Sequence, residues 1–187
     1  IGRAMIDKMP LVAALKRVET FRFNGYGTGG KDLRDSMFVH LQDATYLHTL
    51  DIPGARISGH GLRYLEGLPK LTVLILANAE LDNAGLADLQ NMEQVETLDL
   101  SFTDVSSDGL LYLRRLKRIE SLDLSMTAVT DQGLLHLEQL PDLQHLLLSG
   151  TTVGDPGLMH IQRMSRLSTL DLALTNTTDA GLPRLAA

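Results

Sequence analysis

Acidic side chains recur at a fixed spacing in this chain and are its first candidates for chemistry. Asp99 and Asp123 stand 24 residues apart, each inside the same four residues, Leu-Asp-Leu-Ser. On neighbouring strands their carboxylates would lie about 5 Å apart, like the paired acids of a retaining glycosidase or a cation site, and one pKa would rise. An open strand face has no pocket that orients a substrate or excludes water. We therefore interpret the acids as a solvated face or a partner contact, and predict no catalytic residue.

A glycine-rich segment, Gly25 to Lys31, imitates two nucleotide-binding motifs, because it fits both G-x-x-x-x-G-K and G-x-G-x-x-G. A phosphate-binding loop needs serine or threonine after the lysine, whereas Asp32 here would set a negative charge against the phosphates. The dinucleotide motif needs a surrounding βαβ unit, and the next strand, near Leu47, follows a different pattern. We interpret the segment as an inserted turn and predict no cofactor.

Histidines and one basic run offer weaker signals. His136 and His160 share a repeat position, but two histidines without a third ligand make a weak metal site, so we predict an exposed outer face and no metal. The basic run is expected at a helix C-terminus, where cations meet the negative end of the macrodipole. It comprises Arg114, Arg115, Lys117 and Arg118.

The elements that position these residues follow from a repeat of 24 residues. Its apolar residues stand at unit positions 1, 4, 6, 11, 16, 19 and 22, with glycine at position 15. One such unit cannot bury its apolar face without a stacked neighbour, so the period predicts a solenoid. The copies begin at Leu47, Leu71, Val95, Ile119, Leu143 and Leu167.

Each unit predicts one short strand and one short helix. From Thr97 to Ser101, leucines alternate with small polar residues, which is the pattern of a strand with one buried face. Leucines at a spacing of three predict a helix with an apolar stripe, and the glycine is expected to allow close packing in its first turn. Pro156 is expected to be a first helical residue. The expected helix N-caps, at position 13, are Gly59, Asn83, Ser107, Asp131, Asp155 and Asp179.

Stacking sets the shape of the whole chain. Parallel strands lie about 4.8 Å apart whereas helices need about 8 to 10 Å, so equal numbers of each bend the stack with the strands inside. We predict a right-handed α/β solenoid, a horseshoe arc whose parallel sheet forms the concave face and whose short helices form the convex face.

The L-x-x-L-x-L pattern resembles the leucine-rich repeat family, and the D-x-G-L helix start resembles its ribonuclease-inhibitor-like branch. The 24-residue repeat pattern and the lack of cysteine resemble those of bacterial members of the family. The resemblance implies binding on the concave sheet. One departure is position 9, where the family has asparagine or cysteine, and a threonine hydroxyl satisfies fewer backbone groups, so we expect weaker hydrogen bonding within the turns. The residues are Thr103, Thr127, Thr151 and Thr175.

Two regions follow from the repeat. Residues 47–187 hold six repeats, and residues 1–46 form an irregular N-terminal repeat region with a partial helix, one strand from Val18 to Phe23 and the glycine-rich inserted loop. The chain starts inside a repeat and stops inside a helix without a polar capping unit, so we expect an excerpt of a longer protein. End-to-end self-association is a further hypothesis. It would use Leu170, Leu172, Leu182 and Leu185.

Composition excludes several classes of protein. A net charge of −6 argues against a nucleic-acid binder, which needs a basic surface. No apolar stretch is long enough to span a bilayer, and none resembles a signal peptide, which favours the cytoplasm although an export signal before Ile1 would not be seen. Zero cysteines exclude disulfides and thiolate metal sites. With 4% aromatic residues the chain has few large anchors for a tight interface.

We predict a protein- or peptide-binding module without enzymatic activity, whose partner is extended or helical and partly basic. Phe102 and Met126 follow their strands directly and either anchor this partner or tuck into the loops. The alternatives are the recognition arm of a larger enzyme, of ubiquitin-ligase or kinase type, and a structural spacer. The candidate contacts are Asp51, Thr97, Asp99, Ser101, Phe102, Ser121, Asp123, Ser125, Met126, His145, Leu147 and Asp171.

Overall fold

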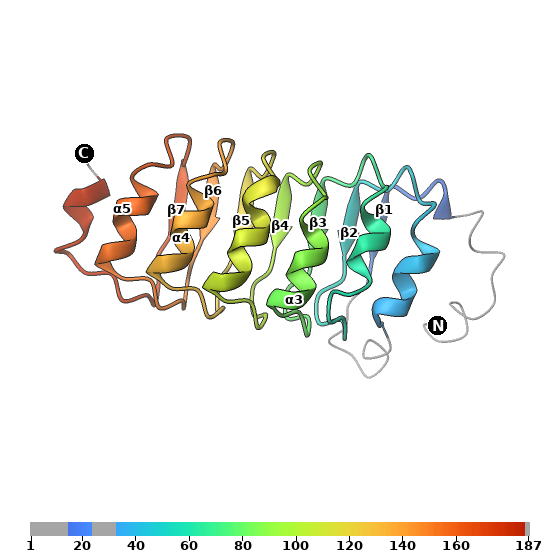
Figure 1. Ribbon diagram of the computed structural model, residues 1–187, viewed down its shortest axis with the longest axis horizontal. Helices are drawn as coiled ribbons and strands as arrows, with labels where there is room; N and C mark the ends of the chain where they lie inside the picture. Colours follow the sequence, from blue (N-terminus) through green and yellow to red (C-terminus); the bar gives the residue numbers. More distant parts are fainter. Residues whose placement is uncertain (1–14, 24–32, 186–187) are drawn as a thin grey trace.

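The strands form one parallel sheet in chain order (Figure 1), in a computed structural model that describes residues 15–23 and 33–185. Equivalent positions of successive repeats lie opposite one another, as Leu74 lies opposite Leu98 and Leu98 opposite Leu122. The glycine-rich segment Gly25 to Lys31 and the expected partial helix before Leu15 fall outside the described residues. The strands are β1 (Thr20–Arg22), β2 (Thr49–Asp51), β3 (Val73–Ile75), β4 (Thr97–Asp99), β5 (Ser121–Asp123), β6 (His145–Leu147) and β7 (Thr169–Asp171).

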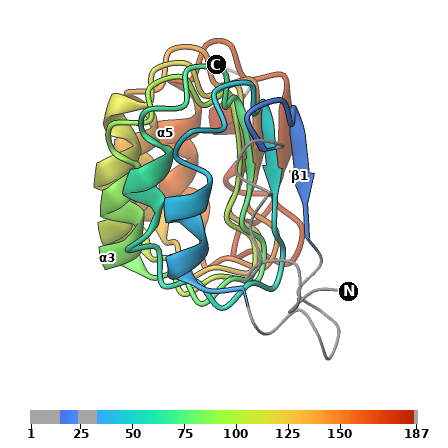
Figure 2. The same ribbon diagram turned by 90° about the vertical axis from the view of Figure 1, so that its right-hand side faces the viewer.

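Short helices lie on one side of this sheet (Figure 2). The outer side of the helices is called the helix face below, and the opposite side of the molecule the sheet face. None of the described helices is long and apolar enough to cross a bilayer. The α-helices are α3 (Asn83–Leu86), α4 (Asp131–Leu137) and α5 (Leu158–Ile161). The 3-10 helices are η2 (Asp35–His40), η3 (Leu62–Leu65), η4 (Ala87–Leu89), η5 (Ser107–Arg115), η6 (Asp155–Gly157) and η7 (Leu182–Leu185).

Leucine side chains fill the space between the two layers. The central residue of a strand, such as Leu74, Leu98 or Leu122, is no more than 1% exposed. Burying one such side chain contributes about 1.5 to 3 kcal/mol, and only a neighbouring repeat can complete that burial. The predicted α/β solenoid with its parallel sheet and its layer of short helices is confirmed.

The threonines at position 9 work within their own repeat. Each buried hydroxyl donates to the carbonyl of the leucine three residues before it, as Thr103 does to Leu100 at 2.6 Å and Thr127 to Leu124 at 2.6 Å. The turns of adjacent repeats are joined instead by backbone bonds, such as that from the Phe102 amide to the Ser125 carbonyl at 2.9 Å. At position 9 the side chain therefore needs to supply only one hydrogen-bond donor, and a hydroxyl does so.

In four repeats the residue at position 13 begins its helix and does not cap it. α3 begins at Asn83 with Asp82 as its N-cap, and α4 begins at Asp131 with Thr130 as its N-cap. These predicted N-caps are therefore wrong by one residue, and Gly59 lies two residues before Gly61, the N-cap of η3. Pro156 is likewise the second residue of η6 and not the first.

The side chain at position 13 instead serves the helix of the following repeat. Asn83 Oδ1 accepts a hydrogen bond from the Ser106 amide at 2.9 Å, and Asp131 Oδ1 accepts one from the Gly154 amide at 2.7 Å. Ser106 and Gly154 are the N-caps of η5 and η6, whose first amides lack partners inside the helix. The starts of η5 and η6 are thus fixed by the repeat before them. Further pairs of this kind are Ser107 with Thr130 and Asp155 with Thr178.

The glycine at position 15 leaves room for this close approach. A Cβ atom on Gly109 would lie 2.3 Å from Oδ1 of Asn83, and one on Gly85 would lie 1.8 Å from the backbone oxygen of Ser58. Both distances are shorter than any van der Waals contact. The expectation that packing explains the recurring glycine is confirmed.

We predict that Gly85→Ala lowers the free energy of unfolding by about 1 to 3 kcal/mol, since the new methyl group meets backbone atoms that cannot move aside cheaply. Gly67→Ala is the matched control, because a Cβ there meets nothing within 4 Å, and it should be neutral or stabilising by up to about 1 kcal/mol. Urea unfolding followed by circular dichroism measures both. Equal effects of the two substitutions would contradict the packing explanation.

Candidate functional site

Ten of the twelve predicted contact residues lie on β4, β5 and β6 or directly after these strands, whereas Asp51 lies on β2 and Asp171 on β7. The register places Asp99 opposite Asp123, so the two carboxylates lie side by side as predicted. Thr97, Ser121 and His145 form the neighbouring row across the same three strands. Leucines between the two rows point into the core, so this face consists of the polar alternation of the strands.

The four predicted acids are not equivalent. Asp51 lies opposite Ile75 and makes an ion pair with Arg22, whose Nε is 2.9 Å from Asp51 Oδ2. Asp171 lies two strands beyond Asp123, because Leu147 on β6 stands between them. The pair on β4 and β5 is therefore the uncompensated acidic centre of the sheet face. Asp51, nearer the N-terminal end of the sheet, is neutralised by Arg22.

Each strand-end carboxylate uses one oxygen to order the turn that follows. Oδ1 of Asp99 accepts from the amide and the hydroxyl of Ser101 at 2.9 and 2.7 Å, and Oδ1 of Asp123 accepts from the Ser125 amide at 2.8 Å. Among the described residues, no hydrogen bond reaches Oδ2 of either acid. Ser101 itself is only 6% exposed, so it supports Asp99 and does not offer the direct contact that we predicted for it.

Burial raises the pKa of Asp99, the carboxylates of Asp123 and Asp51 raise it further, and the hydrogen bonds from Ser101 oppose the rise. The predicted rise is confirmed, but its main cause is burial and not the paired acid. A carboxylate held with a raised pKa costs stability when it is ionised. The folded chain therefore gains nothing from keeping this charge at neutral pH.

Large apolar side chains border the acidic pair where the strands end. Phe102, Met126 and Leu174 occupy repeat position 8 and are 56%, 49% and 82% exposed. They do not tuck into the loops, which was the alternative prediction. Together they form an apolar edge of the sheet face, called the rim below.

The rim residues also adopt a backbone conformation that is unfavourable for them. Their φ angles are +58°, +58° and +57°, in the left-handed region that L-residues with a side chain rarely occupy. Sequence reasoning missed this strain, although the residues at the same position in other repeats signalled it. Those residues are Gly54, Asn78 and Gly150, the types that accept a positive φ most readily.

His145 extends the polar row beyond the acids. Its Nδ1 lies 2.9 Å from the hydroxyl of Thr169 on β7, and both side chains are exposed. Thr169 was not among the predicted contacts, and its place follows only from the pairing of β6 with β7. This row can exchange hydrogen bonds with a partner, but no group of three potential metal ligands occurs among the described residues.

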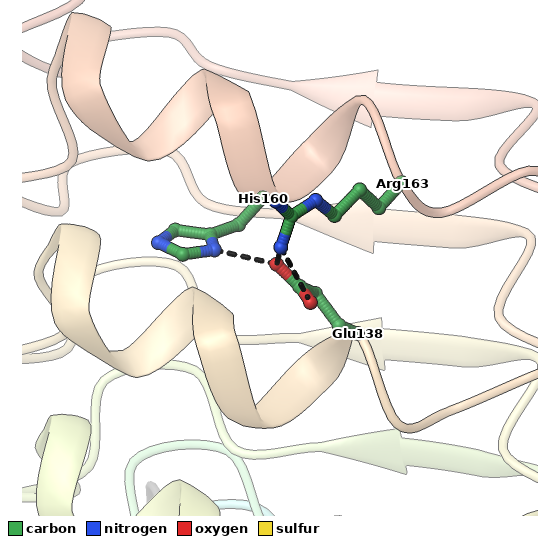
Figure 3. Close-up of polar contacts among 3 residues, drawn as sticks. All are labelled: Glu138, His160 and Arg163. Carbon is green, nitrogen blue, oxygen red and sulfur yellow. Dashed lines mark hydrogen bonds and ion pairs between the residues drawn. The ribbon is translucent and has the colours of Figure 1, made fainter.

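The histidine on the helix face has a structural partner. Nδ1 of His160 lies 2.6 Å from Oε1 of Glu138 in the preceding repeat, and Nη1 of Arg163 lies 3.2 Å from the same oxygen (Figure 3). The side chains of Glu138 and His160 are only 12% and 20% exposed. The prediction of an exposed outer face is wrong for His160, because this cluster links α5 to the end of α4.

A published family description and two known structures are similar to this chain. The Leucine Rich repeat family matches residues 94–113. The crystal structure of internalin C2 from Listeria monocytogenes has a TM-score of 0.73 at 24% identity, covering 93% of this chain and 70% of that chain. For internalin inlF of the same organism the values are 0.58 and 17%, covering 98% of this chain and 64% of that one, so this chain spans less than two thirds of it. A comparison with curated proteins finds no match.

These similarities concern the fold. The match to the family covers β4 and most of η5, and the structural likeness extends over nearly the whole chain. With the parallel sheet and the 24-residue register, they show a leucine-rich-repeat solenoid. The ribonuclease-inhibitor-like branch and a bacterial origin stay predictions.

We predict that Glu138→Gln lowers the free energy of unfolding by about 1 kcal/mol at neutral pH, because it removes the charge that His160 and Arg163 contact. Burial acts to raise the pKa of Glu138, but the hydrogen bonds and charges of those two residues lower it by more. A lowered pKa in the folded state gives stability that is present above the usual glutamate pKa, near 4.5, and is lost as the pH falls through the folded value.

Chemical unfolding of both proteins at pH 7, 5 and 3 tests this cluster. The difference between wild type and Glu138→Gln should shrink on acidification below about pH 4.5. Glu66→Gln is the matched control, because Glu66 occupies the same repeat position three repeats earlier and is exposed. A difference that persists unchanged at pH 3 would contradict the role of the charge.

Proposed function

We propose that the chain is a binding module whose sheet face holds a protein or peptide segment with basic and apolar side chains. The observation that carries this proposal is the rim, where Phe102 and Met126 are exposed to solvent in a strained conformation directly beside Asp99 and Asp123. The fold supports the proposal, because a stacked parallel sheet offers an extended, rigid surface. The concave sheet predicted from the sequence is this same surface.

The rim is hard to explain by folding alone. A left-handed conformation costs a residue with a side chain roughly 1 to 2 kcal/mol, and glycine stands at the same position of two other repeats. Phe102 and Met126 remain about half exposed, so burial only partly offsets this cost. Strain of this kind persists where the surrounding structure fixes it, and it gathers at functional sites. Contact with an apolar partner surface gives these side chains the burial that the free chain lacks.

The charges define the other half of the partner. Asp99 and Asp123 lie side by side with one oxygen each free of hydrogen bonds among the described residues, and Asp171 follows beyond Leu147. A lysine or arginine of the partner would relieve the repulsion between neighbouring carboxylates and lower the pKa of Asp99. The polar row of Thr97, Ser121 and His145 supplies uncharged hydrogen-bonding groups.

The proposal assigns no reaction to this face. The pair of acids lies on an open strand surface, and a hollow of about 260 Å³ is lined by Arg22 and Asp51, which pair with each other. The alternative interpretation, a recognition arm of a larger enzyme of ubiquitin-ligase or kinase type, would use the same surface. A test of the acidic pair therefore tests the part that both hypotheses share.

Charge reversal by Asp99→Lys together with Asp123→Lys should weaken binding of a basic amphipathic probe by about tenfold or more. It should also reduce the dependence of that binding on salt concentration. The probe is a fluorescein-labelled synthetic peptide of lysine and leucine, titrated with the full chain at several ionic strengths. Fluorescence anisotropy gives the dissociation constants, and affinity capture with the same variant identifies natural partners that depend on the pair.

Asp43→Lys with Glu66→Lys is the matched control for this reversal. Both residues are exposed and lie away from the sheet face, and the change in net charge is the same. Unchanged binding of the probe by the Asp99→Lys and Asp123→Lys double variant would reject the sheet face as the site. An equal loss of binding in the control would reject it as well. Thermal unfolding of each variant verifies that the fold is intact.

Phe102→Gly with Met126→Gly should weaken the same binding severalfold while leaving the midpoint of thermal unfolding unchanged or higher. Glycine removes the left-handed strain of about 1 to 2 kcal/mol per site, which exceeds the roughly 0.4 to 1 kcal/mol that its freer unfolded chain costs, and the difference offsets the loss of partial burial. An ordinary structural residue would show the opposite, a lower midpoint and unchanged binding. Anisotropy titration and differential scanning calorimetry separate the two outcomes.

A further inference from the structure

Three consecutive repeats expose a large apolar side chain on the helix face. Leu111 of η5, Leu135 of α4 and Met159 of α5 are 43%, 49% and 46% exposed, and all three occupy repeat position 17. α4 packs against both η5 and α5, and the helices follow one another along one side of the molecule (Figure 1). The three side chains at position 17 therefore form a row across three helices, called the helix-face stripe below. Other described repeats have Val39, Arg63, Ala87 or Pro183 at this position.

A hollow of about 470 Å³ adjoins the stripe at Leu111. Its apolar wall is Leu111 with Tyr112, and its charged wall is Arg114 and Arg115 at the end of η5 with Lys117 just beyond. The volume lies within the range of about 300 to 1,000 Å³ that is usual for ligand pockets. The hollow therefore combines apolar surface with positive charge in a chain whose net charge is −6.

The positive charge of this hollow is largely uncompensated. The contact of Arg115 with Glu93 is long, at 4.0 Å, and both side chains are at least 60% exposed, so the pair contributes little. Nζ of Lys117 donates to the neutral carbonyl of Gln139 at 2.7 Å. That bond holds the ammonium group at the hollow without neutralising it. Burial is the main cause that lowers the pKa of His136; the charge of Arg114 lowers it further, and Asp108 opposes this effect.

We propose that the hollow and the helix-face stripe form a second binding site, for an acidic, amphipathic segment of a protein. Its carboxylates would meet Arg114, Arg115 and Lys117, and its apolar side chains would cover Leu111 and continue along the stripe over Leu135. Charge complementarity selects this occupant, since the site is positive and the remainder of the chain is acidic. The site lies on the opposite face from the acidic pair and the rim, and it is independent of their function.

Other ligands fit these observations less well. A small inorganic anion would use the cations but not the exposed row of leucine and methionine, which extends two repeats beyond the hollow. Nucleic acid needs a broad basic surface, whereas this chain is acidic overall. An anionic membrane would meet only a few cations, and the rest of the surface would be repelled.

Anisotropy titration of a fluorescein-labelled peptide of glutamate and leucine with the full chain tests the site. Arg114→Glu with Arg115→Glu should weaken binding of this peptide by about tenfold or more, and Leu135→Ser should weaken it severalfold. Absence of measurable binding to the wild-type chain would overturn the proposal. Unchanged binding after Leu135→Ser would overturn the contact along the stripe.

Arg63→Glu with Lys70→Glu is the matched control, because both residues are exposed, lie outside the hollow and change the net charge equally. This control should alter binding by less than about twofold, and an equal loss there would reveal a nonspecific charge effect and overturn the site. The sheet-face variant Asp99→Lys with Asp123→Lys should still bind the acidic peptide. A failure of the helix-face proposal is thus distinguished from a failure of the sheet-face proposal.

Sedimentation with vesicles of phosphatidylserine and phosphatidylcholine supplies the competing outcome. The chain should remain in solution at physiological salt. Co-sedimentation that is lost on Arg114→Glu with Arg115→Glu, without binding of the peptide, would overturn the proposal in favour of a lipid surface. Circular dichroism and thermal unfolding establish that every variant is folded, which is expected for the helix-face and control variants because their substituted side chains are exposed.

Discussion

Contact between successive repeats is the constraint on which the rest of this structure depends. A strand of three residues and a helix of one or two turns have no stability alone, so the leucine layer becomes favourable only when repeats pile in register. The register is strict: Leu74, Leu98 and Leu122 lie opposite one another in adjacent strands. A polar link adds to this layer at the starts of η5 and η6, where the side chain of Asn83 or Asp131 accepts a hydrogen bond from an amide of the next repeat.

The same coupling explains what sequence reasoning could and could not predict. The 24-residue period, the strands and the pairing of Asp99 with Asp123 follow from hydrophobic spacing, because spacing alone determines which residues face the core. Four of the helix N-caps were predicted one residue late, because residues such as Asn83 and Asp131 are types that favour a cap. They do perform a capping role, but for the neighbouring repeat, and a single repeat read by itself does not contain that information.

The candidate site likewise has features that could be predicted from the sequence and features that could not. Side-by-side acids on β4 and β5 could be predicted, whereas the burial that raises the pKa of Asp99 depends on how the turns close around it. The strain at Phe102 and Met126 was also not predicted, since their own residue types argue against a left-handed backbone. Backbone bonds to the next repeat hold it in place, from the Phe102 amide to Ser125 and from the Met126 amide to Ser149. The solenoid itself therefore supplies the rigidity that displays the rim.

A stack of this kind separates its two faces chemically, since strand positions and helix positions of one repeat vary without affecting each other. The repeat that begins at Val95 shows this separation most clearly. Its strand carries Asp99 and the exposed Phe102 to the sheet face, while its helix carries Leu111 and the cations of the hollow to the helix face. Side chains of opposite charge thus lie on opposite sides of one leucine core, too thick for direct pairing between them. Under the two proposals made for these faces, a segment attracted to one face is repelled by the charge of the other, so the two faces would discriminate between basic and acidic partners.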